Sequence, residues 1–224
     1  MRLSPQFKAR AYDLVPAIPL LLLYGLAIAA TLLQIAAKAD RGLAPMPTAL
    51  GLEILAQVAT VIFLGVQITV FITRRLPEAR LGGAAPILAA VAGAISPLLL
   101  VALPKAPASM ARSTLSMVLI IVGTAAAIWV LAILGRSFAI LPQARGLVTK
   151  GPYRLIRHPL YLAQQISTFG VMFQFMQPWS FLIAVASFAP QIVRMRYEEA
   201  ILAKTYPAYR DYMRTTWRLI PGIY

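Results

Sequence analysis

Cysteine is absent from the 224 residues, and histidine occurs once, as His158. Without cysteine the chain has no disulfide, no thiolate metal site and no cysteine nucleophile. A single histidine also excludes a metal site built from several histidines. We therefore expect no bound metal ion.

Charge is scarce as well, and apolar residues are in excess. Charged residues make up 12% of the chain, hydrophobic residues make up 60%, and the mean hydropathy is +0.75. Soluble domains are about half apolar and about a quarter charged, so an ordinary soluble globule is excluded, as is a disordered chain. The net charge of +14 comes from basic residues placed between apolar runs, which is typical of loops that face an anionic membrane surface. The sequence predicts an all-α integral membrane protein with membrane lipids around it and no nucleic-acid partner.

Six apolar stretches are predicted as membrane helices. A helix needs about 20 apolar residues to cross the hydrocarbon core of a bilayer. The first four stretches reach this length, whereas the last two are shorter. Because only Gln177 and Pro178 separate these two, we expect them to form a short helical hairpin. The stretches are 14–37, 48–73, 84–103, 113–134, 160–176 and 179–193.

The distribution of basic residues predicts the orientation. With six crossings, seventeen of the 21 Lys and Arg residues fall on one side of the membrane, and the other four are Lys38, Arg41, Lys105 and Arg112. Loops rich in Lys and Arg stay in the cytoplasm. Both termini and a cofactor pocket are therefore expected on the cytoplasmic face, in a bacterial inner membrane or its equivalent. Residues 1–134 are expected to be a scaffold and residues 135–224 the motif-bearing region of one integrated domain.

The segment 151–161 precedes the fifth stretch and carries the first motif. Pro159 suits the first turn of a helix, which places His158 near the helix start. Free backbone N–H groups and the positive end of the helix dipole favour a carboxylate or phosphate there. A polar stripe follows at helical spacing and either holds a polar ligand or bonds neighbouring helices. Its members are Tyr161, Gln164, Gln165 and Thr168.

Two adjacent carboxylates, Glu198 and Glu199, follow the sixth stretch. Arg194 lies four residues before Glu198, so an ion pair on one helical face accounts for one carboxylate. Adjacent residues of a helix point about 100° apart, which leaves Glu199 for a ligand and Arg194 or Arg196 for a substrate anion. The aromatic, arginine-rich tail 206–224 is interpreted either as an interfacial helix or as a segment that closes a site.

Together these motifs resemble the isoprenylcysteine carboxyl methyltransferase family. The resemblance covers 146–224 and rests on Gly-Pro-Tyr-x-x-x-Arg-His-Pro-x-Tyr, Glu-Glu-x-x-Leu, Tyr-x-x-Tyr and Arg-Leu-Ile-Pro. It implies an all-helical membrane enzyme that uses S-adenosylmethionine without a Rossmann domain, and no glycine-rich dinucleotide fingerprint occurs in the chain. The implied acceptor is lipophilic, enters from the bilayer and presents an isoprenylcysteine-like carboxylate.

The same resemblance implies roles for particular residues. The cofactor would contact Leu147, Val148, His158, Pro159, Tyr161, Glu198 and Glu199. Arg194 and Glu199 would lie nearest the reacting groups and are the catalytic candidates. A carboxylate acceptor needs an anchor and no strong base, whereas an amine or thiol would need a base, for which His158 is the candidate.

Two other functions stay open from the sequence. A sterol-type membrane reductase that uses NADPH has a similar Arg-His-x-x-Tyr-like segment and Arg-x-Ile-Pro ending, although Pro159 and the two adjacent glutamates favour the methyltransferase. A non-enzymatic channel or transport subunit would also explain a buried polar stripe. The sequence does not determine whether the acceptor is a carboxylate, an amine, a thiol or another lipid.

Overall fold

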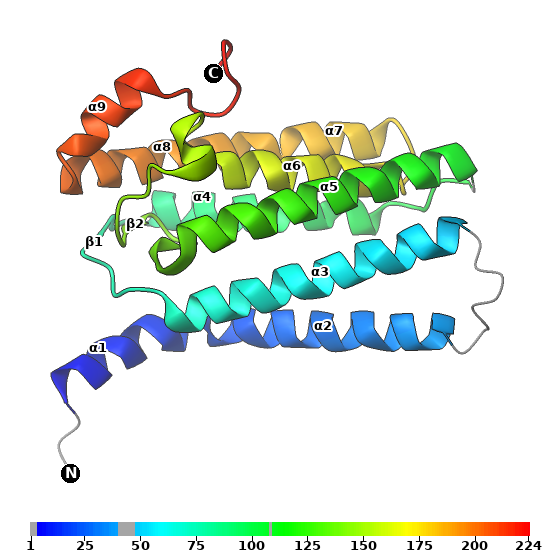
Figure 1. The fold of residues 1–224 in the computed structure, drawn as a ribbon, viewed down its shortest axis with the longest axis horizontal. Coiled ribbons are helices and arrows are strands. Elements are labelled where there is room, and N and C mark those ends of the chain that lie inside the picture. Colours follow the sequence, from blue (N-terminus) through cyan, green and yellow to red (C-terminus); the bar gives the residue numbers. More distant parts are fainter. Residues whose placement is uncertain (1–3, 40–47, 108) are drawn as a thin grey trace.

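The computed structural model describes residues 4–39, 48–107 and 109–224, and its long helices run side by side in one bundle (Figure 1). The strands β1 and β2 that it describes have two residues each, so the predicted all-α class is confirmed. In chain order the described elements are α1 (Pro5–Leu14), η1 (Val15–Ala17), α2 (Ile18–Ala39), α3 (Thr48–Thr73), β1 (Ala79–Arg80), α4 (Ala84–Ile95), η2 (Ser96–Ala102), α5 (Met110–Leu134), η3 (Gly135–Ser137), β2 (Gln143–Ala144), η4 (Gly151–Arg154), α6 (Pro159–Met172), α7 (Trp179–Ala186), α8 (Phe188–Thr205) and α9 (Ala208–Thr215).

Four helical segments of the described chain are long and apolar enough to cross a membrane. They are Ile18–Ala39, Leu50–Thr73, Ala84–Ala102 and Met110–Ser137, and they coincide with the first four predicted stretches. The hairpin after them is present, because α6 packs against α7. However, α6 has 14 residues and α7 has 8. Since neither spans a bilayer as a single straight helix, the count of six crossings stays a prediction.

Prolines explain where the apolar stretches break. Pro190 has no N–H to donate to the carbonyl of Ala186, and its ring crowds that carbonyl. The predicted sixth helix is therefore divided at Ser187 into α7 and α8. Pro97 likewise follows the end of α4 and is the second residue of the 3₁₀ segment η2. Beyond its break, α8 continues as one helix to Thr205 and carries both glutamates of the second motif.

Glycines bring α5 and α6 into close contact. A Cβ atom on Gly123 of α5 would lie 2.5 Å from the backbone nitrogen of Ser167, and one on Gly170 of α6 would lie 2.8 Å from the carbonyl oxygen of Ser116. Small residues at such positions allow two helix backbones to approach in a membrane. The main apolar core adjoins this contact, between α3, α5 and the start of α6. The helix α6 therefore packs against α5 along most of its length.

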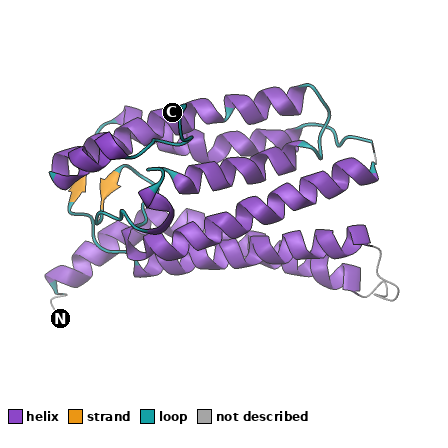
Figure 2. Ribbon diagram, turned by 45° about the horizontal axis from the view of Figure 1, so that its top comes forward, coloured by secondary structure: helices purple, strands orange, loops and turns teal. Residues whose placement is uncertain are grey.

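The loop that carries the first motif and the part of α8 that carries the second lie at one end of the bundle (Figure 1). There β1 pairs with β2 in antiparallel register, Ala79 opposite Ala144, which joins the loop after α3 to the loop after α5. The helices α1 and α9 lie at this same end (Figures 1 and 2). The two described terminal segments are thus at one end of the bundle, as a common side requires, while the cytoplasmic assignment stays a prediction.

Candidate active site

The start of α6 is bound to the C-terminal tail. Pro159 is the first residue of α6, and His158 occupies the N-cap position. The backbone N–H of Arg157 donates to the carbonyl of Trp217 at 2.8 Å, and that of His158 donates to Arg218 at 3.0 Å. The tail therefore folds over the start of α6, in agreement with the second interpretation of its sequence.

Glu199 lies among three side chains of basic type. Its Oε1 accepts a hydrogen bond from Nε of Arg157 at 2.8 Å and lies 3.1 Å from Nε2 of His158, while Oε2 accepts from Nη2 of Arg218 at 2.7 Å. Burial by itself would raise the pKa of Glu199, but the hydrogen bonds with His158, Arg218 and Arg157 lower it to about 2. Glu199 is therefore ionised, and it joins α8 to both the start of α6 and the tail.

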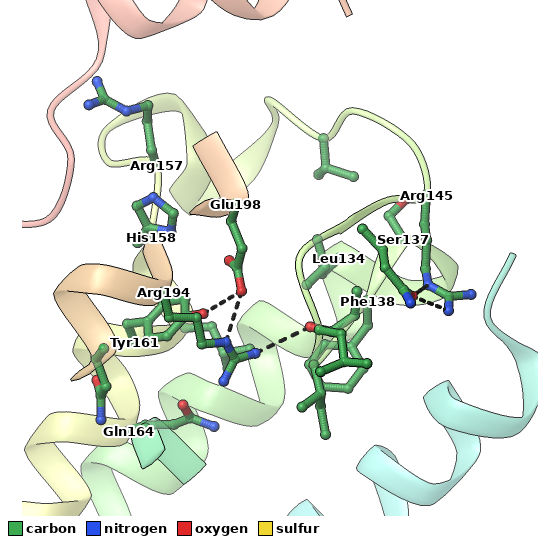
Figure 3. A pocket seen from close by; sticks show the side chains of 18 of the residues that line it. Leu134, Ser137, Phe138, Arg145, Arg157, His158, Tyr161, Gln164, Arg194 and Glu198 are labelled. Carbon is green, nitrogen blue, oxygen red and sulfur yellow. Dashed lines mark hydrogen bonds and ion pairs between the residues drawn. The ribbon is translucent and has the colours of Figure 1, made fainter. Parts of the chain in front are cut away.

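Glu198 makes a separate set of contacts. The hydroxyl of Tyr161 donates to Oε1 of Glu198 at 2.6 Å, and Nε of Arg194 donates to the same oxygen at 2.9 Å. The guanidinium of Arg194 lies over the ring of Tyr161, 5.1 Å from its centroid. Its Nη2 also donates to the carbonyl of Ala139 at 3.4 Å (Figure 3). The ion pair predicted from the spacing of Arg194 and Glu198 is present, so each of the two adjacent carboxylates has a basic partner.

A cavity of about 310 Å³ lies between these groups and the loop that follows α5 (Figure 3). Pro159 and Glu199 are not among the residues that line it in the described structure. Predicted site residues that do line it are Leu147, Val148, His158, Tyr161, Arg194 and Glu198. The two motifs, about 40 residues apart in the chain, therefore meet at one cavity.

A buried ion cluster supports the loop that carries Leu147 and Val148. Arg145 is 1% exposed, and its Nη2 donates to Oδ1 of Asp13 at 2.6 Å. Nε of Arg74 donates to Oδ2 of the same carboxylate at 2.9 Å. Burial would raise the pKa of Asp13, but hydrogen bonds from and charges of Arg145 and Arg74 outweigh it, so the pKa lies below its usual value. Sequence reasoning missed this cluster, whose only signal is an acidic residue just before the first apolar run.

The remaining walls of the cavity come from the predicted polar stripe and from the first half of the chain, whose contribution sequence reasoning missed. Gln164 and Thr168 of the predicted polar stripe line the cavity, whereas Gln165 points elsewhere and donates to the carbonyl of Ala184 at 2.9 Å. These two residues of the stripe thus face the cavity and Gln165 bonds a neighbouring helix, so each interpretation of the spacing applies to part of the stripe. The first half of the chain contributes further lining residues, among them Tyr24, Gln67 and Gly93.

Fold and cavity together define a polytopic helical protein with a partly enclosed cavity at one end of its bundle, where charged groups of both motifs adjoin a largely apolar wall. Residues 111–209 match the model of the phospholipid methyltransferase family. This match covers the cavity residues of both motifs and confirms the resemblance to integral membrane methyltransferases.

Two curated relatives are metal-resistance proteins. The chain is 34% identical over 80 residues to the cobalt-zinc-cadmium resistance protein CzcN of Cupriavidus metallidurans, covering 34% of this chain and 36% of the relative. It is 31% identical over 119 residues to the nickel-cobalt-cadmium resistance protein NccN of Alcaligenes xylosoxydans xylosoxydans, covering 51% of this chain and 52% of the relative. The matches thus span about half of these relatives' length or less.

Proposed function

We propose that the protein transfers the methyl group of S-adenosylmethionine to a lipophilic acceptor, and that this acceptor presents a carboxylate of the isoprenylcysteine type. One observation carries the proposal. The cavity of about 310 Å³ joins the start of α6 to Arg194 and Glu198 of α8, within the region that matches a methyltransferase family.

The cavity residues that come from the two motifs and from the loop after α5 fit such a cofactor. Tyr161 and Arg194 both bond Oε1 of Glu198, which leaves Oε2 for a hydroxyl or ammonium group of a ligand among the described contacts. Leu147 and Val148 supply an apolar wall suited to an adenine ring. The N–H groups of Leu160 and Tyr161, in the first turn of α6, have no carbonyl of their own helix to bond and suit a carboxylate. Glu198, Leu147 and Val148 are therefore assigned to cofactor binding, together with His158 and Tyr161.

Glu199 acts through other residues in this proposal. It lies 3.1 Å from Nε2 of His158 and bonds Arg157 and Arg218, so it fixes the N-cap of α6 and the tail. Because it does not line the cavity in the described structure, we assign it as a positioning residue rather than as a ligand contact.

The chain's own groups have to align the acceptor and exclude water. When bound, the cofactor supplies a methyl group already activated by its sulfonium, so positioning carries most of the catalysis. Arg194 keeps Nη1 without a hydrogen-bond partner among the described contacts, which suits it to anchor an acceptor carboxylate. Tyr209 and Tyr212 of α9 cover the cavity from the side of the tail and keep water out.

Calorimetric titration of the purified protein with S-adenosylmethionine tests the cofactor assignment. Glu198→Gln removes a charge-assisted contact and is expected to weaken binding about tenfold or more. Glu53→Gln is the matched control, because Glu53 pairs with Lys38 near the other end of the bundle. Failure of the unaltered protein to bind S-adenosylmethionine would refute the proposal. Methyl-labelled cofactor, offered with prenyl-cysteine analogues and lipid extracts, then identifies the acceptor.

Both relatives are named for metal resistance, but we do not extend a metal-binding role from those names to this chain. In the described residues no group of three or more His, Cys, Asp or Glu side chains is placed to hold a metal ion. We therefore propose no second function from those names.

A further inference from the structure

Two buried glutamines line the cavity, and the side-chain oxygen of each has no hydrogen-bond partner in the described structure. Gln67 of α3 and Gln191 of α8 are each 4% exposed, and both line the cavity. Within the described structure, the buried Oε1 atom of each has no hydrogen-bond partner. Buried polar side-chain atoms are nearly always hydrogen-bonded in proteins. Two such side chains in the wall of one cavity, contributed by two different helices, indicate that a ligand completes the bonding of their amides.

The helix register places Gln191 deeper in the bundle than the charged groups of α8 that line the cavity. Along α8, Gln191 precedes Arg194 by three residues and Glu198 by seven. At a rise of about 1.5 Å per residue, Gln191 lies about 4.5 Å deeper than Arg194, on the same face of the helix. Gln67 is six residues from the end of α3, about 9 Å into the bundle by the same rise. Gln191 therefore lies deeper than Arg194, the group that we assign to the acceptor carboxylate, and Gln67 lines the same cavity from α3. We call this part of the cavity its inner end.

The inner end carries no counter-charge for an ion. The charged side chains of the described cavity wall are Arg145, Arg157, Arg194 and Glu198, and His158 is the other basic group. All of them belong to the loop after α5, the start of α6 or the part of α8 from Arg194 onward. An ammonium or a second carboxylate at the inner end would be buried without a partner, at a prohibitive cost. A glutamine amide offers one acceptor and two donors, which suits an uncharged hydrogen-bonding group.

We propose that Gln67 and Gln191 form a specificity subsite for an uncharged hydrogen-bonding group, a hydroxyl or an amide N–H, attached beside the methylated carboxylate of a lipophilic acceptor. This inference rests on the proposed function, because Arg194 sets the place of the carboxylate. Apolar neighbours continue the same wall and receive the alkyl chain. They include Phe63, Leu64 and Pro97.

A matched pair of lipids tests the subsite by direct binding. 2-Hydroxyhexadecanoate carries a hydroxyl on the carbon next to its carboxylate, and hexadecanoate lacks only that hydroxyl. In calorimetry with S-adenosylhomocysteine present, which has no methyl group to transfer, the unaltered protein is expected to bind the hydroxy acid at least tenfold more tightly, because a site built to bond a hydroxyl rejects the analogue without it. Gln67→Leu and Gln191→Leu should each reduce the preference to about twofold or less, with the affinity for S-adenosylmethionine unchanged.

Gln165→Leu is the control variant. Gln165 is also buried with an unsatisfied Oε1, but it does not line the cavity and should keep the full preference. Equal binding of the two acids by the unaltered protein overturns the subsite, and so does a preference that survives in both cavity variants. If the unaltered protein does not bind S-adenosylmethionine at all, the proposed function is overturned instead. The two failures are therefore distinguishable.

Discussion

The carboxylate of Asp13 pairs with two buried arginines and balances their charge. Asp13→Asn should therefore destabilise the protein strongly. Arg74 is 6% exposed and Arg145 is 1% exposed, and each donates to Asp13 at less than 3 Å. The substitution keeps the shape of the side chain but removes its negative charge. Two guanidinium groups then remain buried beside each other with only neutral partners.

The size of the effect follows from burial. Breaking a buried ion pair by removing one partner costs about 3–5 kcal/mol. The third arginine of the cluster, Arg80, has a side chain that is 52% exposed and lies 3.4 Å from Asp13, so water screens its contribution. We expect the free energy of unfolding to fall by about 3–5 kcal/mol. For a chain of this size, this loss corresponds to a fall in Tm of about 10 °C.

Thermal unfolding of the protein in detergent provides the measurement, with binding of S-adenosylmethionine as a second readout. Because Arg145 supports the loop of Leu147 and Val148, the affinity for the cofactor should fall as well. Arg145→Met added to Asp13→Asn should restore part of the stability, since it removes one uncompensated charge. A Tm within about 2 °C of the unaltered protein, less than 1 kcal/mol by the same conversion, would refute this account of the cluster.

Three further predictions concern the helix contacts and the motif residues. Glu199→Gln should cost about 3 kcal/mol at pH 7, from the lowering of its pKa from 4.5 to about 2. This stabilisation is complete above about pH 5 and is lost as the pH falls through about 2, so the difference in unfolding temperature between variant and unaltered protein should shrink in acid. Gly123→Ala forces a Cβ atom to within 2.5 Å of the α6 backbone and should cost about 1–3 kcal/mol in thermal unfolding. Gly65→Ala, which meets no atom within 4 Å, should not. Arg194→Lys keeps the charge but loses the planar fork, so the KM for a carboxylate acceptor should rise about tenfold while the Kd for S-adenosylmethionine changes little.

The long helices and the meeting of the two motifs were predictable because each follows from a local pattern. Hydropathy runs of about 20 residues give the membrane helices, and all four long ones coincide with the prediction. Pro159 gives the start of α6, and the spacing of Arg194 and Glu198 gives their ion pair. The break at Ser187 was missed, although Pro190 is the residue that causes it.

The partners of single polar residues were not predictable, because they come from distant parts of the chain. Asp13 pairs with Arg74 and Arg145, and nothing in the local pattern of any of the three residues indicates the other two. Glu199 was favoured over Glu198 as a ligand contact because the helical spacing paired only Glu198 with an arginine. Three distant residues of basic type surround Glu199 in the structure, and Glu198 is the one that lines the cavity.

The two ends of the cavity are built from different parts of the chain. Its outer end is built from the loop after α5, the start of α6 and α8, all within the residues that match the methyltransferase family. Its inner end takes walls from α2, α3 and α4, through Tyr24, Gln67 and Gly93, which lie before residue 111, where the match begins. A family match can therefore support a shared cofactor without fixing the acceptor. If the N-terminal helices shape the acceptor end, exchanging α2–α4 with those of a relative should change the acceptor preference while the affinity for S-adenosylmethionine stays the same.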